Sequence, residues 1–244
     1  PSAYGAMLGA NIYKLPRDKI VMNGYPRFDQ LFKANNDSYT KIRLELSDYL
    51  NFKISKNTSL CLYTPTFRKY DNNYTFPLEK LEDYNCEKLD IFLKKNNIYL
   101  IYTKHPQTIY EGGWEKLENC IYLSYEKNQL FDISYFLQAF DVLINDYSTT
   151  STDFALLDRP QVFYMPDYEY YSSEKGFVEN YRALLAGCEV ANFNQLIEVV
   201  DEIMLDPCAY NARFEQKRQE LLAKYYDSST GDSSEKFYKY ISDL

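Results

Sequence analysis

The chain has 244 residues, of which 45% are hydrophobic, and a formal net charge of −8. This size fits one large domain or one domain with an appendage, with an ordinary globular core. The acidic excess argues against a broad nucleic-acid-binding surface, which needs a basic face. No apolar run approaches the ~20 residues of a membrane-spanning helix. Residues 1–10 lack the basic start and long apolar core of a secretory signal.

Five cysteines stand at positions 61, 86, 120, 188 and 208 without a paired spacing. An odd count without a Cys-x-x-Cys pair indicates reduced cytosolic thiols rather than a disulfide framework or a zinc site. The chain has one histidine, and no Asp-x-Asp pair follows a predicted strand, so we expect neither a metal site nor a cofactor. The 26 tyrosines are spread evenly, which favours compositional bias over an aromatic recognition surface.

The predicted elements alternate between strands and helices along most of the chain. Short or buried strands are predicted over residues 20–22, 59–63, 98–102, 120–123, 141–144 and 161–164. Helices are predicted over residues 38–50, 86–95, 132–140, 149–157, 194–205 and 210–224, and a last one begins at Ser233. This alternation predicts a mainly parallel sheet in an α/β layer fold. Residues 56–244 should therefore form one Rossmann-like domain, preceded by a fragment of a different structural unit.

The most informative stretch spans residues 143–160, where an apolar strand ends in carboxylates and hydroxyls. Four hydroxyl residues follow Ser148 and favour a helix start, because their oxygens accept hydrogen bonds from free N–H groups. A helix start just past a strand also attracts phosphate. We therefore predict that Ser148 and Thr149 bind phosphate, while Asp146 holds the loop or bonds to a ribose or acceptor hydroxyl. The alternative is an ordinary Asx or Ser/Thr helix cap.

Several blocks of the sequence occur together in the order of one known family. They lie at residues 23–29, 63–68, 104–106, 146–149, 153–155, 159–160 and 231–235. The stretch Asp146-Tyr147-Ser148-Thr149, followed by Asp153-Phe154-Ala155 and Arg159-Pro160, resembles the signature of the CDP-glycerol glycerophosphotransferase family. That family comprises the polymerases and primases of teichoic acids and capsules. The resemblance spans nearly the whole chain, and the ordered set of blocks is far more specific than any one of them.

The resemblance implies an architecture. Family members have two Rossmann-like domains that face each other across a cleft, the GT-B arrangement, and this chain resembles the C-terminal, nucleotide-binding half. Residues 56–244 would be that domain, and residues 1–55 a hinge or remnant of the acceptor-side domain with a linking helix. The first domain of the family carries a Trp-His-Gly-Thr block, whereas Trp114 and His105 lie in no such block. We therefore expect the acceptor-side domain to be absent or truncated.

The resemblance also implies an activity. The family moves glycerol phosphate, or a related alditol phosphate, from a CDP-alditol to a hydroxyl of a growing wall or capsule polymer and releases CMP. The expected partners are CDP-glycerol or a related CDP-alditol and a polymer or lipid-linked acceptor, with no nucleic acid. The expected location is the cytoplasm, with peripheral contact at the inner membrane face. The alternatives are a GT-B glycosyltransferase that uses a nucleotide sugar and a nucleotide-binding module that is inactive on its own.

The candidate catalytic residues are His105 and Asp146. His105 lies just past a predicted strand, where ligands bind in open α/β sheets, and beside Lys104. It could donate to a diphosphate oxygen and stabilise the leaving nucleotide, although a histidine that serves only the turn is the alternative.

The remaining candidates for nucleotide or phosphate binding are Arg68, Glu174, Ser233 and Ser234. Arg68 could clamp a phosphate, or it could be a solvated loop arginine. Glu174 is expected in a loop that lines the nucleotide pocket. Ser233 and Ser234 open a capping-box-like helix start that could form a second phosphate cradle.

Two further residues have expected roles outside the assigned site. Arg27 is expected in the interdomain hinge, where it could reach the cleft or pair with Asp29. Asp153 is interpreted as a structural carboxylate that caps a neighbouring loop or pairs with Arg159.

Overall fold

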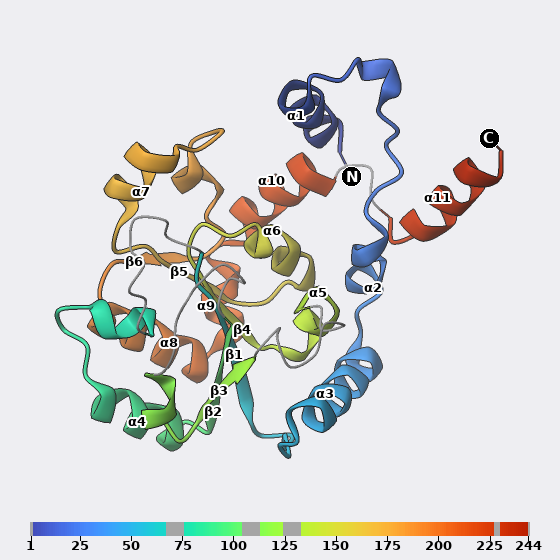
Figure 1. Cartoon of the computed structure of the whole chain (residues 1–244). Helices are drawn as coiled ribbons and strands as arrows, with labels where there is room; N and C mark the ends of the chain where they lie inside the picture. The colour runs from blue at the N-terminus through green and yellow to red at the C-terminus, as the bar shows by residue number, and fades with distance from the viewer. Residues whose placement is uncertain (1, 67–75, 104–112, 124–132, 227–229, 244) are drawn as a thin grey trace.

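The centre of the molecule is a sheet of parallel strands in a computed structural model that describes residues 2–66, 76–103, 113–123, 133–226 and 230–243 (Figure 1). The strands of the described sheet are β1 (Ser59–Thr64), β2 (Ile98–Thr103), β3 (Cys120–Leu123), β4 (Val142–Asn145), β5 (Gln161–Tyr164) and β6 (Cys188–Val190). Their order in space is β3-β2-β1-β4-β5-β6, and each neighbouring pair is parallel. This is the strand order of a Rossmann fold, so the predicted α/β class with a mainly parallel sheet is confirmed.

Helices connect and cover these strands. The α-helices are α1 (Ala3–Tyr13), α2 (Asp29–Phe32), α3 (Asn36–Leu50), α4 (Cys86–Lys95), α5 (Ile133–Phe136), α6 (Thr150–Phe154), α7 (Tyr168–Lys175), α8 (Phe193–Leu205), α9 (Pro207–Ala212), α10 (Glu215–Tyr226) and α11 (Ser233–Ser242). Short 3-10 turns are η1 (Arg17–Lys19), η2 (Pro26–Phe28), η3 (Pro77–Lys80), η4 (Trp114–Lys116), η5 (Leu137–Ala139), η6 (Ala155–Leu157) and η7 (Tyr181–Leu184).

Asparagine side chains mark the start of three longer helices. The Asn35 side chain accepts a hydrogen bond from the N–H of Ser38 at 2.9 Å at the start of α3. Asn85 caps α4 and Asn192 caps α8 in the same way, at 2.8 and 2.9 Å. Each amide oxygen satisfies an N–H group that has no partner within the helix, so the local sequence fixes where these helices begin.

The sheet is buried on both faces because alternate strand residues pack into two separate apolar clusters. On one face Cys61 and Tyr63 of β1 pack with side chains of α4 and α8. On the other face Leu60 and Leu62 pack with side chains of α3 and α5. A parallel sheet with both faces covered explains why its strands are continuous apolar runs in the sequence.

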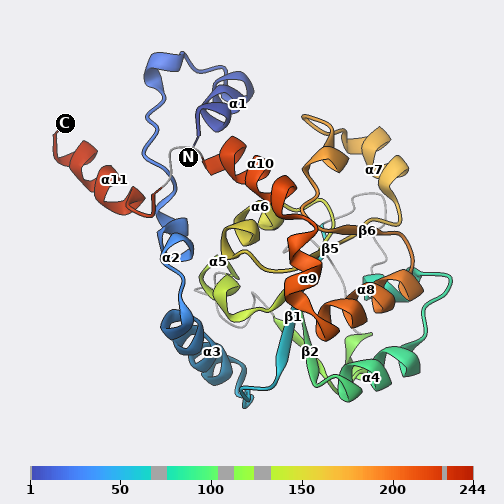
Figure 2. The same ribbon diagram turned by 180° about the vertical axis from the view of Figure 1, so that it is seen from behind.

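The N-terminal segment and the last helix lie together, away from the sheet. Figures 1 and 2 both show α1, α2 and α11 at one end of the molecule and α4 at the opposite end. α1 contacts α10, and α11 contacts η2. Within the described residues, the structure contains no helix that is both long and apolar enough to cross a membrane.

The structure corrects parts of the predicted element map. Residues 20–22 do not form a strand, since no strand of the described residues pairs with them and the side chains of Val21 and Met22 are about half exposed. The helix predicted over 210–224 is two helices, α9 and α10. α1, α7 and β6 were not predicted. The strands at 120–123 and 161–164 and the helix at 86–95 are confirmed with the predicted bounds.

Candidate functional site

The candidate site begins at the carboxyl ends of β1 and β4. These two strands are neighbours in the sheet although two α-helices, two strands and their loops separate them in the chain. Their last residues, Thr64 and Asn145, stand in register, and the Thr64 hydroxyl donates to Asn145 Oδ1 at 3.0 Å. In a Rossmann sheet this is the point where the strand order reverses, and ligands bind in the crevice outside it.

Asp146 joins the loops that leave these two strands. Its carboxylate oxygens accept hydrogen bonds from the N–H of Thr66 at 2.9 and 3.0 Å, and Oδ1 also accepts from the Thr66 hydroxyl at 2.5 Å. The N–H of Tyr147 donates to the same oxygen at 2.6 Å. The side chain is buried. Of the roles predicted for Asp146, the geometry supports holding the loop.

Ser148 and Thr149 follow at the start of α6. The Ser148 hydroxyl lies 2.9 Å from the hydroxyl of Thr150 and accepts a hydrogen bond from the N–H of Thr150 at 3.3 Å. Asn145 holds this turn, since its side-chain amide donates to the Ser148 carbonyl at 2.9 Å. Ser148 thus accepts from the N–H of the first residue of α6, while the N-cap residue, Thr149, is exposed and makes no side-chain cap hydrogen bond.

A cavity of about 480 Å³ opens beside this turn. The Ser and Thr residues that line it are Ser148, Thr149, Ser151 and Thr152. Aromatic residues form much of the rest, namely Tyr25, Phe28, Tyr147, Tyr171, Phe177, Tyr181, Tyr225 and Tyr226. Leu8, Arg27, Asp153, Gly176, Val178, Glu179 and Leu184 complete the lining. The combination of hydroxyls and aromatic faces suits a ligand with a polar, anionic part and a flat ring.

The aromatic wall is tightly packed. The rings of Tyr147 and Tyr171 stack with centroids 4.0 Å apart, and those of Phe177 and Tyr181 stack at 4.9 Å. The Tyr147 hydroxyl donates to Asp167 at 2.9 Å, and the Tyr181 hydroxyl donates to the carbonyl of Asp146 at 2.5 Å. The wall is thus bonded directly to the end of β4. The interpretation of the tyrosines as compositional bias overlooked this cluster, because the ring positions lie far apart in the sequence.

Arg27 supplies the cation among the described residues that line the cavity. Its guanidinium lies over the rings of Phe28 and Tyr25, 4.4 and 5.5 Å from their centroids. The residue is exposed, and no carboxylate of the described chain forms an ion pair with it. The predicted alternative of a pair with Asp29 is not found, because Asp29 bonds elsewhere. The sequence alone predicts Arg27 in the interdomain hinge and does not assign it to the site.

Asp153 has a structural partner in the same cavity. Its carboxylate accepts a hydrogen bond from the Tyr226 hydroxyl at 2.7 Å. Burial raises the pKa of Tyr226, and the nearby Asp153 charge raises it further, so the hydroxyl stays protonated as a donor. Arg159 instead donates to the carbonyls of Gln138 and Phe140. The structural interpretation of Asp153 is supported, with a different partner from the one considered.

Ser233 and Ser234 lie outside the cavity lining. Their N–H groups donate to the two oxygens of the Asp29 carboxylate at 2.9 and 2.8 Å. The start of α11 is therefore capped by Asp29, a residue from the other end of the chain. The N–H groups predicted to cradle a phosphate are bonded to a carboxylate in this structure.

The other predicted site residues are placed as follows. Glu174 is exposed and lies in helix α7 rather than in the predicted loop, and it does not line the cavity. Gly176 and Phe177, just after that helix, do line it. His105, Lys104 and Arg68 lie outside the described residues.

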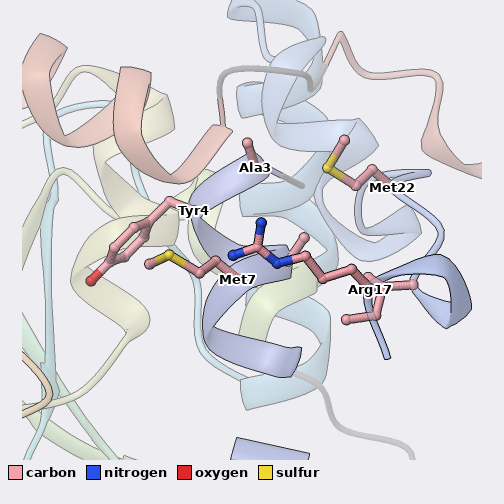
Figure 3. Close-up of a pocket in the computed structure, with 7 residues that line it drawn as sticks. Ala3, Tyr4, Met7, Arg17 and Met22 are labelled. Atoms are coloured by element: carbon pink, nitrogen blue, oxygen red, sulfur yellow. The ribbon is translucent and has the colours of Figure 1, made fainter. Parts of the chain in front are cut away.

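A second hollow of about 460 Å³ lies between α1 and residues 17–22. Figure 3 shows the Arg17 guanidinium between Met7 and Met22, with Tyr4 directed to the other side. Tyr4 and Arg17 are the polar side chains of its lining, whereas the cavity beside α6 has four Ser and Thr hydroxyls in addition to its tyrosines and Arg27. Nowhere in the described residues do three or more His, Cys, Asp or Glu side chains gather in a way that could hold a metal ion.

Comparisons of the sequence and the fold with known proteins point to one family. The chain is 30% identical over 215 residues to a teichoic acid glycerol-phosphate transferase of Staphylococcus aureus, covering 83% of this chain and 50% of the relative. It is 28% identical to a teichoic acid poly(glycerol phosphate) polymerase of Bacillus spizizenii, covering 97% and 56%. The chain thus spans about half the length of these curated relatives.

Solved structures show the same fold. A variant of the wall teichoic acid polymerase TagF superimposes with a TM-score of 0.76 at 23% identity, covering all of this chain and 56% of that one. This coverage agrees with the prediction that the chain is one half of a GT-B fold. The family model for CDP-glycerol:poly(glycerophosphate) glycerophosphotransferase matches residues 1–243. The chain therefore belongs to the CDP-glycerol:poly(glycerophosphate) glycerophosphotransferase family.

Proposed function

We propose that this chain is the donor-binding half of a CDP-alditol phosphotransferase. The complete enzyme would transfer glycerol phosphate, or a related alditol phosphate, from the CDP-alditol to a hydroxyl of a growing wall or capsule polymer and release CMP. Family membership supports the reaction class. The names of the relatives, which are teichoic acid glycerol-phosphate transferases and polymerases, support the polymer.

The observation that carries the proposal is the cavity beside the turn that follows β4, which is lined by hydroxyl side chains, by Arg27 and by stacked aromatic rings. We assign the diphosphate to Ser148, Thr149 and Arg27, because hydroxyl donors and an unpaired guanidinium suit phosphate oxygens. The cytosine would lie against the aromatic rings, which every base can use as a stacking surface.

In this proposal the catalytic power comes from positioning and charge stabilisation, as in phosphoryl transfer generally. His105 and Lys104 follow β2 by one or two residues in the sequence, and we propose that they stabilise the charge on the leaving CMP together with Arg68. Asp146 acts through the loop that it holds. The acceptor hydroxyl and its general base would come from outside this chain.

The proposed acceptor is a polymer or a lipid-linked precursor, so the proposed place of action is the cytoplasmic side of the membrane, with peripheral contact. Isothermal titration of the chain with CDP, UDP and GDP tests the donor assignment. We expect CDP to bind more tightly than the other two nucleotides. A clear preference for UDP or GDP would instead favour a glycosyltransferase that uses a nucleotide sugar.

A further inference from the structure

The cavity wall formed by residues 176–180 has little main-chain support. It follows the end of α7, and none of the N–H groups of residues 177–180 donates a main-chain hydrogen bond within the described structure. The segment nevertheless contributes Gly176, Phe177, Val178 and Glu179 to the cavity. Side-chain contacts must therefore hold the wall in place.

The Phe177 ring packs against tyrosine rings, and Glu179 makes the polar contacts to α1 and α10. Oε1 of its carboxylate accepts hydrogen bonds from the hydroxyls of Tyr4 at 2.8 Å and Tyr225 at 2.5 Å, and Oε2 pairs with the ammonium of Lys224. The Glu179 side chain is 21% exposed and that of Lys224 31%. Three side chains, one from α1 and two from α10, thus meet at the Glu179 carboxylate.

The charges of this cluster also matter to the cavity. Burial alone would raise the pKa of Glu179, but the hydrogen bonds from Lys224, Tyr225 and Tyr4 outweigh burial and hold that pKa below its ordinary value. Glu179 is therefore ionised at neutral pH, and Lys224 balances its charge. A carboxylate at the edge of a cavity for a diphosphate would repel the ligand if it were unpaired.

We propose that Glu179 is a positioning residue for the donor cavity, linking α1 to the cavity wall through Tyr4 and fixing the wall against α10 through Tyr225 and Lys224. The inference rests on the proposed function, because it takes the occupant of the cavity to be a cytidine diphosphate. It goes beyond that function by coupling donor affinity to the N-terminal helix, although Tyr4 does not itself line the cavity.

The test is a double-mutant cycle on CDP affinity, measured by calorimetry at pH 7. Glu179→Gln should weaken CDP binding roughly tenfold and Tyr4→Phe roughly threefold, because hydrogen bonds to a charged group are lost. The double variant should bind as weakly as Glu179→Gln alone, since Tyr4 acts through Glu179. Glu202→Gln, the same change in the exposed ion pair with Arg213, is the matched control and should bind like the wild type.

A measurement without nucleotide separates this inference from the proposed function. Near-ultraviolet circular dichroism reports the packing of the tyrosine rings, and we expect Glu179→Gln to change it while Glu202→Gln does not. If wild-type protein fails to bind CDP but the spectrum changes as expected, the proposed function is wrong and the positioning role stands. If CDP binds and Tyr4→Phe has no effect, or the two effects multiply in the double variant, the positioning role is wrong.

Discussion

The carboxylate of Asp29 and the N–H of Ser233 meet at 2.9 Å across 204 positions of sequence. The second carboxylate oxygen accepts the N–H of Ser234, so one acidic residue near the N-terminal end caps the last helix. An anion at a helix start satisfies free N–H groups and interacts favourably with the helix dipole. The contact explains why the N-terminal segment and helix α11 share one end of the molecule.

Replacing Asp29 with Ala should remove this contact and lower the stability of the folded protein. Burial raises the pKa of Asp29, but the hydrogen bonds from Ser234 and Ser233 outweigh it and hold the pKa below the ordinary value of 3.8. A lowered folded-state pKa stabilises the fold above the unfolded pKa, and that gain is lost as the pH falls through the folded pKa. We expect a cost of about 0.5–2 kcal/mol at pH 7.

Differential scanning calorimetry of wild type and Asp29→Ala from pH 7 down to pH 3 checks this. The difference in Tm should be constant near neutrality and shrink below pH 4. Asp37→Ala, at an exposed position in the first turn of α3, is the comparison. A gap in Tm that is unaffected by acid would mean that the Asp29 carboxylate does not stabilise the fold by its charge.

A second prediction concerns the close approach of β5 and the turn before β6. A Cβ atom on Gly187 would lie 2.0 Å from the carbonyl oxygen of Gln161, which is a backbone atom that cannot rotate away. Gly187→Ala should therefore force the two segments apart and cost at least ~1–3 kcal/mol, as overpacked sites do.

The matched control is Gly9→Ala in α1, where no atom lies within 4 Å of the added Cβ. There the substitution should stabilise the helix, because alanine is a better helix former than glycine by ~1 kcal/mol. Thermal denaturation followed by far-ultraviolet circular dichroism should thus move in opposite directions for the two variants. A Tm of Gly187→Ala equal to that of the wild type would show that the turn before β6 can move to accommodate the added methyl group without loss of stability.

Elements fixed by interactions between residues close in sequence were predicted correctly, whereas features that depend on residues far apart in sequence were not. Strands β3 and β5 and helix α4 were predicted with their observed bounds, because apolar runs and caps are local signals. Residues 20–22 have the composition of a strand, but a strand also needs a partner, and the described chain supplies none. β6 has three residues and its pattern is too short to recognise.

The same distinction applies to the site. Ser148 and Thr149 were predicted because hydroxyls after a strand are a local motif, and both line the cavity. Glu179 was not predicted, since its role depends on Tyr4 and Tyr225, which are 175 and 46 positions away. Pairings of that range arise only when the chain folds.

Arg27 should contribute directly to donor affinity. Arg27→Ala is expected to weaken CDP binding by about 1.5–3 kcal/mol, the range for hydrogen bonds to charged groups. Arg27→Lys should restore only part of that loss, because an ammonium cannot make the two parallel bonds of a guanidinium. Arg17→Ala, which removes a cation from the second hollow instead, is the control. CDP affinity is measured by calorimetry at two salt concentrations. Equal affinities of Arg27→Ala and Arg17→Ala would contradict the assignment of Arg27 to the diphosphate.

His105 offers a test that needs no assignment of signals, because it is the one histidine in the sequence. In protein labelled at histidine, the imidazole gives a single set of NMR resonances whose shift follows its pKa. A diphosphate beside the ring favours the charged imidazolium, so saturating CDP should raise the pKa of His105. Titration curves recorded with and without CDP that coincide would place the ring away from the phosphates.

The role of His105 in catalysis can be tested by the kinetics of the complete enzyme. A group that stabilises charge on the leaving phosphate acts mainly in the transition state, so His105→Ala should lower kcat more than it weakens nucleotide binding. The expected loss is roughly 2.7–4 kcal/mol if the imidazole acts like an oxyanion-hole donor. Calorimetry with CDP on the same variant supplies the comparison. An unchanged kcat would contradict a role for His105 in stabilising the leaving phosphate.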